Sequence, residues 1–166
     1  MQLTSPAFGD GGPIPRQYTE DGNNSSPPLR WEEVPEAAAE LVLIVDDPDA
    51  PSEQPFVHWV VYKIPADTEG MPASVPHEEQ LVSPPGALQG LNDFSRNSLG
   101  YGGPAPPRGH GVHQYNFTLY AIDEPLDLGP GMTKDAVLEA MAGHVLEQAH
   151  YVGTYERTES GEAEAA

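Results

Sequence analysis

Acidic and histidine side chains that could do chemistry together lie in two short stretches of this sequence. The first, DDPDAP (46–51), follows an apolar run and places Asp47 and Asp49 on either side of a proline. The second, GHGVHQY (109–115), carries His113 in a glycine-rich segment. A carboxylate beside an imidazole can hold the ring in one protonation state, join it in binding a metal, or orient a water molecule with it.

The most useful role for these acids near an anion is to orient the histidines. An ionised Asp only accepts hydrogen bonds, so Asp47 or Asp49 would repel an oxyanion unless it holds a histidine that donates to that oxyanion. Gly109 and Gly111 would let backbone N–H groups approach the same oxyanion closely. The alternative for DDPDAP taken alone is a strand-ending turn, in which the Asp side chains accept from their own backbone.

His58 is a third candidate, in the middle of the apolar stretch FVHWVVYKIP (56–65). A lone histidine in an apolar strand is more often a core residue than a ligand-binding one. Its neighbour Trp59 is expected in the core on the opposite face of the strand, because successive side chains alternate. His58 belongs to a site only if the acid loop lies beside it.

A metal site is the main alternative for these residues. His110 and His113 have an H-x-x-H spacing and could bind an ion together with His58, Asp47 and Asp49. That spacing fixes no geometry in a glycine-rich loop, so we expect no metal here.

Other signatures of catalysis and of cofactor binding are missing from the sequence. A calcium loop that starts at Asp47 fails, because Ser52 stands at the glycine position and His58 at the final acid position. The chain has no cysteine, no G-x-S-x-G elbow and no G-K-[ST] phosphate loop. We expect no cofactor and no enzyme activity, although a hydrolase that uses an Asp–His pair stays open.

The charge balance limits the choice of partners. The chain has 26 acidic and 7 basic residues, a formal net charge of −19, and only two of the basic residues are lysines, Lys63 and Lys134. Such a surface repels nucleic acids and anionic membranes. It is typical of proteins that stay soluble in concentrated salt, where charges are screened, and so predicts a halophilic source.

The elements that must position these residues are mostly strands. The 19 prolines and 17 glycines exclude long helices from most of the chain, and its 166 residues suit one domain. Apolar or alternating stretches predict strands at 41–45, 56–64, 114–122 and 150–157. The last three of these ranges include His58, Tyr115 and Arg157.

One helix is expected, over 133–149, with Thr133 as its N-cap. Its apolar face would be Val137, Leu138, Met141, Val145 and Leu146. The acidic segment 158–166 is expected to be a disordered tail. No apolar run is long enough to cross a bilayer and the first residues do not resemble a secretory signal, so we expect no membrane insertion and a cytoplasmic protein.

Four ordered segments resemble the signatures of one protein family. They are DGNNSSPPLRW (21–31), DDPDAP (46–51), FVHWVVYKIP (56–65) and the long segment 90–123, which contains GYGGPAPPRGHGVHQY. Together they are similar to the phosphatidylethanolamine-binding protein family, most of all to its compact bacterial and archaeal branch, the Raf-kinase-inhibitor-like proteins. The resemblance covers about 1–157.

This resemblance implies a mainly β, antiparallel β-sandwich-like fold in which a large sheet packs on a smaller one, with one or two helices at the side. It also implies a pocket at one end that takes phosphate-like groups, including phospholipid head groups. The ligand-binding residues that it implies are Asp47, Asp49, His58, Pro106, Pro107, Gly109, Gly111, His113 and Tyr115. The family's usual basic residue after the last histidine is Gln114 here, which removes a positive charge.

The expected function is therefore binding of a small anion or phosphorylated group in a regulatory or inhibitory role. The alternative is an inhibitor that docks on a kinase or a protease, by analogy with relatives. Relatives in this branch also suggest a homodimer.

Overall fold

Two β-sheets form the framework of the protein. The structure is a computed structural model that describes residues 1–158 and 163–164. The smaller sheet has the order β1–β3–β6. Its strands are β1 (Gln2–Thr4), β3 (Leu29–Glu32) and β6 (Gly70–Met71).

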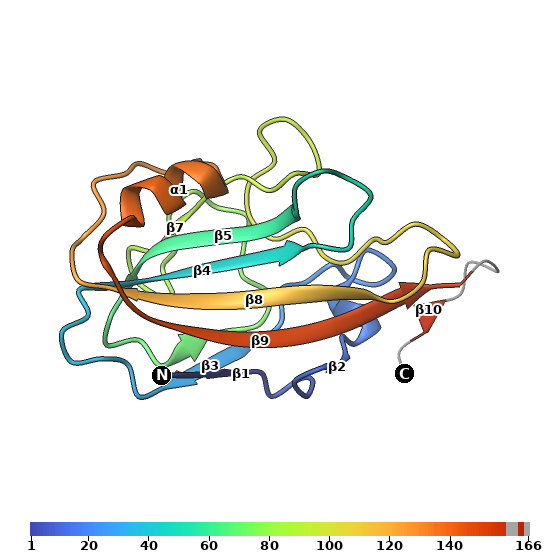
Figure 1. Cartoon of the computed structure of the whole chain (residues 1–166), viewed down its shortest axis with the longest axis horizontal. Helices are drawn as coiled ribbons and strands as arrows, with labels where there is room; N and C mark the ends of the chain where they lie inside the picture. Colours follow the sequence, from blue (N-terminus) through green and yellow to red (C-terminus); the bar gives the residue numbers. More distant parts are fainter. Residues whose placement is uncertain (159–162, 165–166) are drawn as a thin grey trace.

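The larger sheet runs β10–β9–β8–β4–β5–β7, and β2 pairs with β9 in parallel. Its long strands are β4 (Glu40–Asp47), β5 (Phe56–Pro65), β8 (His113–Ile122) and β9 (Val145–Arg157). Its short strands are β2 (Gly12–Pro13), β7 (Leu88–Gln89) and β10 (Ala163–Glu164). A 3-10 turn (Arg16–Tyr18) and the helix α1 (Lys134–Met141) complete the elements. The expected fold, mainly β with a large sheet, a smaller sheet and a helix at the side, is confirmed (Figure 1).

Both faces of the large sheet are covered. On one face Leu43 and Phe117 pack with Trp31 of the small sheet. On the other face Val42 and Val60 pack with residues that include Val137 of α1. A central strand covered on both faces needs apolar residues at every position, which is why β4 carries a continuous apolar run.

The predicted strands are present at or near the expected positions. Along β8, the residues expected to face the core are all buried, whereas most of those between them are partly or fully exposed. The buried set is Tyr115, Phe117, Leu119 and Ala121. This confirms the alternation on which the prediction rested.

The predicted helix is half right. Thr133 is the N-cap and accepts from the backbone N–H of Ala136, at 3.2 Å, as expected. The helix ends at Met141, however, and Gly143 adopts a positive φ of 83° that turns the chain into β9. Val145 and Leu146 therefore belong to a strand and are exposed, which corrects their assignment to the apolar face of a helix. Pairing with β8 from Val145 onward extends the last strand by five residues beyond its predicted start at 150.

The loop after β4 and the loop before β8 lie at the same end of the large sheet, on the right in Figure 1. The antiparallel arrangement explains this, because β4 ends where its neighbours β5 and β8 begin. The two stretches singled out in the sequence are thereby brought together.

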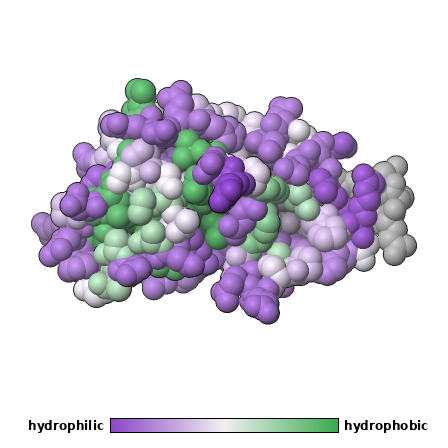
Figure 2. All heavy atoms as spheres, turned by 90° about the horizontal axis from the view of Figure 1, so that it is seen from above, coloured by the Kyte–Doolittle hydropathy of each residue, from purple (hydrophilic) through white to green (hydrophobic). Residues whose placement is uncertain are grey.

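Of the expected tail, 158–166, most residues lie outside the described part of the chain; Ala163–Glu164 pair with β9. Among the described residues, no helix is long and apolar enough to cross a membrane. Figure 2 shows hydrophilic residues over most of the face seen from above, with hydrophobic side chains gathered towards the end away from β10.

Candidate functional site

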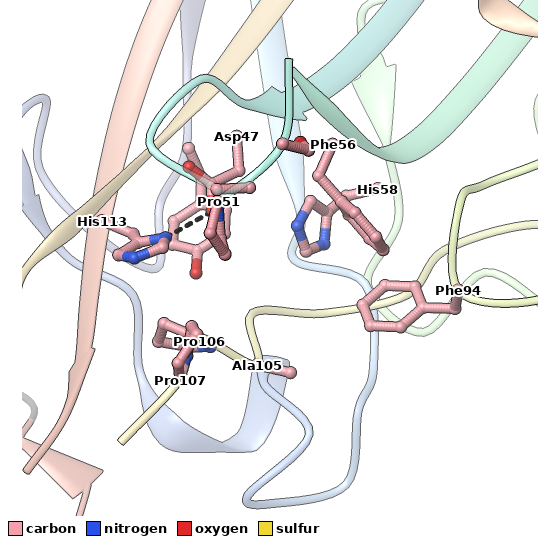
Figure 3. A pocket seen from close by; sticks show the side chains of 12 residues that line it. Asp47, Pro51, Phe56, His58, Phe94, Ala105, Pro106, Pro107 and His113 are labelled. Carbon is pink, nitrogen blue, oxygen red and sulfur yellow. Dashed lines mark hydrogen bonds and ion pairs between the residues drawn. The ribbon is translucent and has the colours of Figure 1, made fainter. Parts of the chain in front are cut away.

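A cavity of about 350 Å³ opens where β4 ends and β5 and β8 begin. Figure 3 shows Asp47, His58 and His113 around it, with Pro106 and Pro107 across the opening. The full lining is Asp47, Ala50, Pro51, Ser52, Phe56, His58, Phe94, Ala105, Pro106, Pro107, His113 and Tyr115. Polar groups at the base and apolar groups around them are the usual composition of a small-molecule site.

His58 reaches this cavity because of a β-bulge. In the pairing of β4 with β5, Asp46 opposes Val57 and Val45 opposes Trp59, so His58 is an extra residue with no partner in β4. A bulge of this kind turns two successive side chains to the same side of a sheet. Trp59 thus lies in the core between the two sheets, on the side of His58, and its expected place on the opposite face is wrong.

The hydrogen bond of His58 fixes which of its nitrogens carries a proton. Its Nδ1 lies 2.6 Å from the carbonyl oxygen of Gly102, and a carbonyl can only accept, so Nδ1 is the donor. Burial lowers the pKa of His58 below its usual range, although the bond to Gly102 and the charge of Asp47 act in the opposite direction. A neutral ring is thus favoured, protonated at Nδ1, with a free lone pair on Nε2.

His113 is held by an acid. Its Nδ1 lies 2.6 Å from Oδ2 of Asp47, and both side chains are almost fully buried, at 2% and 4% exposed. This contact confirms the expectation that an acid of DDPDAP orients a histidine. The other oxygen of Asp47 accepts from the backbone N–H of Asp49, at 2.8 Å, so the turn considered as the alternative is also present.

His110 extends this chain towards solvent. Its Nδ1 lies 2.6 Å from Nε2 of His113. Two nitrogens that share a tetrahedral zinc ion at about 2.0–2.1 Å each would be more than 3 Å apart. The two rings are therefore hydrogen-bonded to each other directly in this structure. Among the described residues, no group of three or more acids and histidines is placed to hold a metal.

The hydroxyl of Tyr115 is the one buried side-chain polar atom, among the described residues, that has no hydrogen-bond partner. The residue is 1% exposed and lines the cavity, with its ring edge-on to His58 at a centroid distance of 5.1 Å. Burial raises the pKa of this phenol well above its usual range, so the hydroxyl keeps its proton and can donate it. Buried polar groups are nearly always paired, and an exception inside a cavity points to a missing ligand or water.

Two phenylalanines complete the cavity wall. Phe56 and Phe94 pack edge-on against each other, at 4.9 Å, and each packs against His58. Gly102 makes the position of Phe94 possible, because a Cβ on Gly102 would collide with the Phe94 ring. Asn92 fixes the same loop: its side chain donates to the carbonyl of Gly100 and accepts from the backbone N–H of Phe94.

A model of the phosphatidylethanolamine-binding protein family matches residues 4–156 of this chain. The chain belongs to this family. A UPF0098 protein of Methanothermobacter thermautotrophicus is 52% identical over 157 residues, which cover 95% of this chain and 99% of the relative. A UPF0098 protein of Aquifex aeolicus is 46% identical over 95% of this chain and 89% of its own length.

Two solved structures of the phosphatidylethanolamine-binding family support the fold. A homologue from Chlamydia trachomatis is 41% identical, with a TM-score of 0.82, and the match covers 93% of this chain and 96% of that one. The Escherichia coli protein YbcL, described as a member of the mammalian family, is 29% identical, with a TM-score of 0.84, and the match covers 93% and 97%.

Six of the nine site residues implied by the resemblance to this family line the cavity. They are Asp47, His58, Pro106, Pro107, His113 and Tyr115. The other three do not line it: Oδ2 of Asp49 accepts from the backbone N–H of Gln114, and the N–H of Gly109 donates to the carbonyl of Arg157. Gly111 adopts a φ of +92° in the same turn. Asp49 therefore joins the two loops, and of the two acids considered for holding a histidine, Asp47 is the one that does so.

Several residues of the site were not found from the sequence. Phe56 and Phe94 were inside the family segments, but an aromatic residue at a strand end or in a loop gives no local sign of a binding role. Gly102 was likewise unmarked within GYGG. The role of Gly102 as hydrogen-bond partner of His58 depends on contact between residues 44 positions apart, which composition and spacing do not reveal.

Proposed function

We propose that the cavity binds a small oxyanion, such as phosphate or a phosphoryl group on a small molecule, and that the protein acts as a regulatory binding protein and not as an enzyme. The described site supplies groups that bind and orient. Ser52 in its lining donates to the backbone carbonyl of Gln54, so its hydroxyl is not paired with a histidine that could act as its base.

The unpartnered hydroxyl of Tyr115 carries this proposal. A phenol with a raised pKa, buried beside His58 and the Asp47–His113 pair, is a donor that awaits an acceptor. An oxyanion in the cavity would accept from Tyr115 and remove the cost of leaving a buried polar group unpaired.

The wall of the cavity indicates what the oxyanion is attached to. Phe56, Phe94 and Pro106 are apolar and lie around the polar base. A small apolar substituent on the oxyanion would be buried against them, and each Å² of apolar area removed from water contributes about 25 cal/mol. Phenyl phosphate should therefore bind more tightly than inorganic phosphate.

Titration calorimetry with these two probes tests the proposal. We expect weak binding in the micromolar to millimolar range, as is usual for a ligand with few contacts, and the tighter constant for phenyl phosphate. NMR spectra should show shifts at His58 and Tyr115. If neither probe gives heat or shifts at millimolar concentration, the proposal is wrong.

Docking on a kinase or protease is a second candidate, and one feature favours it. Val112, 58% exposed, lies directly before His113 of the cavity lining, where the surface of a partner would cover it. In that case the cavity would receive a phosphorylated side chain of the partner. A stable complex with a purified phosphorylated kinase or protease, lost in Val112→Asp, would favour this candidate.

We also propose that the surface is adapted to concentrated salt. Both lysines are used in partly buried ion pairs, Lys63 with Glu40 and Lys134 with Asp46, at 2.9 and 2.7 Å. Little positive charge is left to offset the net charge of −19. The melting temperature should rise by several degrees or more between dilute buffer and about 1 M potassium chloride, as repulsion is screened. An unchanged melting temperature would contradict this.

A further inference from the structure

His58 presents an acceptor to the cavity, which is unusual in a site proposed for anions. Its Nδ1–H is used by the carbonyl of Gly102, and the opposite nitrogen, Nε2, is the one left for a ligand. The ring of His58 points into the cavity towards His113 in Figure 3. In the neutral ring favoured by burial, Nε2 has a lone pair and no proton, so it repels an oxygen that also has only lone pairs.

The other groups around the cavity add few hydrogen-bond donors and little positive charge for an anion. Tyr115 offers one donor, and His113 is occupied on both nitrogens, by Asp47 and by His110. In the part of the chain that the structure describes, no lysine or arginine lines the cavity. The carboxylate of Asp47 is paired with His113, so this region has no surplus of positive charge that would attract a dianion.

The cavity therefore matches a ligand that both accepts and donates. Hydrogen phosphate has oxygens that accept from Tyr115 and a P–O–H group that donates to Nε2 of His58. Sulfate has the same tetrahedral shape and, near neutral pH, carries no proton. A buried acceptor left facing such an anion costs the full penalty of an unsatisfied polar group.

We propose that this site selects oxyanions that carry a proton, such as hydrogen phosphate, over fully ionised oxyanions of the same shape, such as sulfate, and that Nε2 of His58 is the selecting atom. The inference rests on the proposed binding function and names the protonation state of the ligand that it takes. His58 would be a specificity-determining residue, and Tyr115 a donor that serves both kinds of anion.

Calorimetric titration of the unmodified protein with inorganic phosphate and with sulfate, at pH 7 and equal ionic strength, tests the inference directly. Phosphate should bind about tenfold or more tightly than sulfate, the ratio expected from one unsatisfied buried polar group. If sulfate binds within about threefold of phosphate, His58 acts as a protonated donor and the inference is wrong, while the binding function stands. If neither anion binds, the proposed function fails, and the inference fails with it.

Two variants assign the selection to an atom. His58→Asn can keep a donor to the Gly102 carbonyl but has no atom at the place of Nε2, so the phosphate-to-sulfate ratio should fall to about one. Tyr115→Phe removes a donor from both anions, so both affinities should fall by a similar factor and the ratio should stay. A ratio that is kept in His58→Asn would overturn the inference. If His58→Asn does not fold by circular dichroism, the comparison on the unmodified protein still decides.

Discussion

The two ends of strand β4 each carry a paired acid, but their surroundings differ. At the start of the strand, Glu40 accepts from Lys63, at 2.9 Å, and from the backbone N–H of Leu126, at 2.8 Å. Lys63 donates in turn to the carbonyl of Leu126. At the other end, Asp47 pairs with a histidine, and the nearby hydroxyl of Tyr115 is left unpaired beside a cavity.

This difference distinguishes an acid that supports the fold from an acid that lines the candidate site. The Glu40 end contains an acid paired with a permanent cation, and this pair ties the strand to the loop before α1. The Asp47 end places Nε2 of His58 and the hydroxyl of Tyr115, which has no partner among the described residues, around a cavity. Leaving polar groups unpaired costs stability, so this end of the sheet is the one at which we propose that a ligand binds.

The largest effects are expected when Asp47 and Glu40 are each replaced by the corresponding amide. Asp47→Asn should weaken phosphate binding by up to about tenfold, because an amide holds His113 less firmly than a charged carboxylate does, and His113 stacks on the ring of Tyr115, at 6.5 Å, and so helps to place its hydroxyl. Glu40→Gln should lower the free energy of unfolding by about 1–3 kcal/mol and leave phosphate affinity unchanged. Calorimetry and urea unfolding measure both quantities. Tighter phosphate binding by Asp47→Asn would mean that the acid merely repels anions.

Two glycine substitutions test how tightly the wall of the cavity is packed. Gly102→Ala should lower the free energy of unfolding by about 1–3 kcal/mol, because the new methyl group collides with Phe94 in the cavity wall. Gly129→Ala is the matched control, since a Cβ there meets nothing within 4 Å. Equal melting temperatures for the two variants would show that the Phe94 wall is loose.

The pH dependence of stability should differ between the parent protein and His58→Asn. Because burial holds the pKa of His58 below its value of about 6.5 in the unfolded chain, the unfolded state binds more protons just below that pH. Stability from the neutral ring is thus present above pH 6.5 and is lost as pH falls. Between pH 7 and 5, the parent should lose on the order of 1 kcal/mol relative to His58→Asn in anion-free buffer. Parallel curves for the two proteins would contradict a buried neutral His58.

The long strands could be predicted from the sequence because the pattern of apolar and polar residues within each strand reflects which of its faces are covered. The alternation along β8 and the continuous apolar run of β4 follow directly from which faces are covered. The helix prediction went too far because Val145 and Leu146 also fit helical spacing, although Gly143 between them and Met141 was a stop signal in the sequence.

The sequence predicted which residues form the site better than it predicted the role of each residue. The resemblance to the family implied that Asp47 and His113 would belong to one pocket. The roles of Asp49 and His58 could not be derived, because they depend on a bulge and on the carbonyl of Gly102, which only the folded chain brings into place. Phe94 was missed for the same reason.

Two tyrosines allow the most direct test of the central claim. This claim is that a hydroxyl at the Asp47 end of β4 has no partner in the protein because it donates to a ligand. The hydroxyl of Tyr62 donates to the carbonyl of Gly129 and accepts from the N–H of Met132, whereas that of Tyr115 has no partner among the described residues. Tyr62→Phe should cost about 1 kcal/mol of stability and leave phosphate binding unchanged.

The deciding measurement is phosphate affinity and unfolding free energy in Tyr115→Phe. The account predicts a change in stability below about 0.5 kcal/mol and a loss of phosphate affinity of about fivefold to tenfold, since only the bound state uses this hydroxyl. Unchanged phosphate affinity, together with a loss of stability as large as that of Tyr62→Phe, would contradict it.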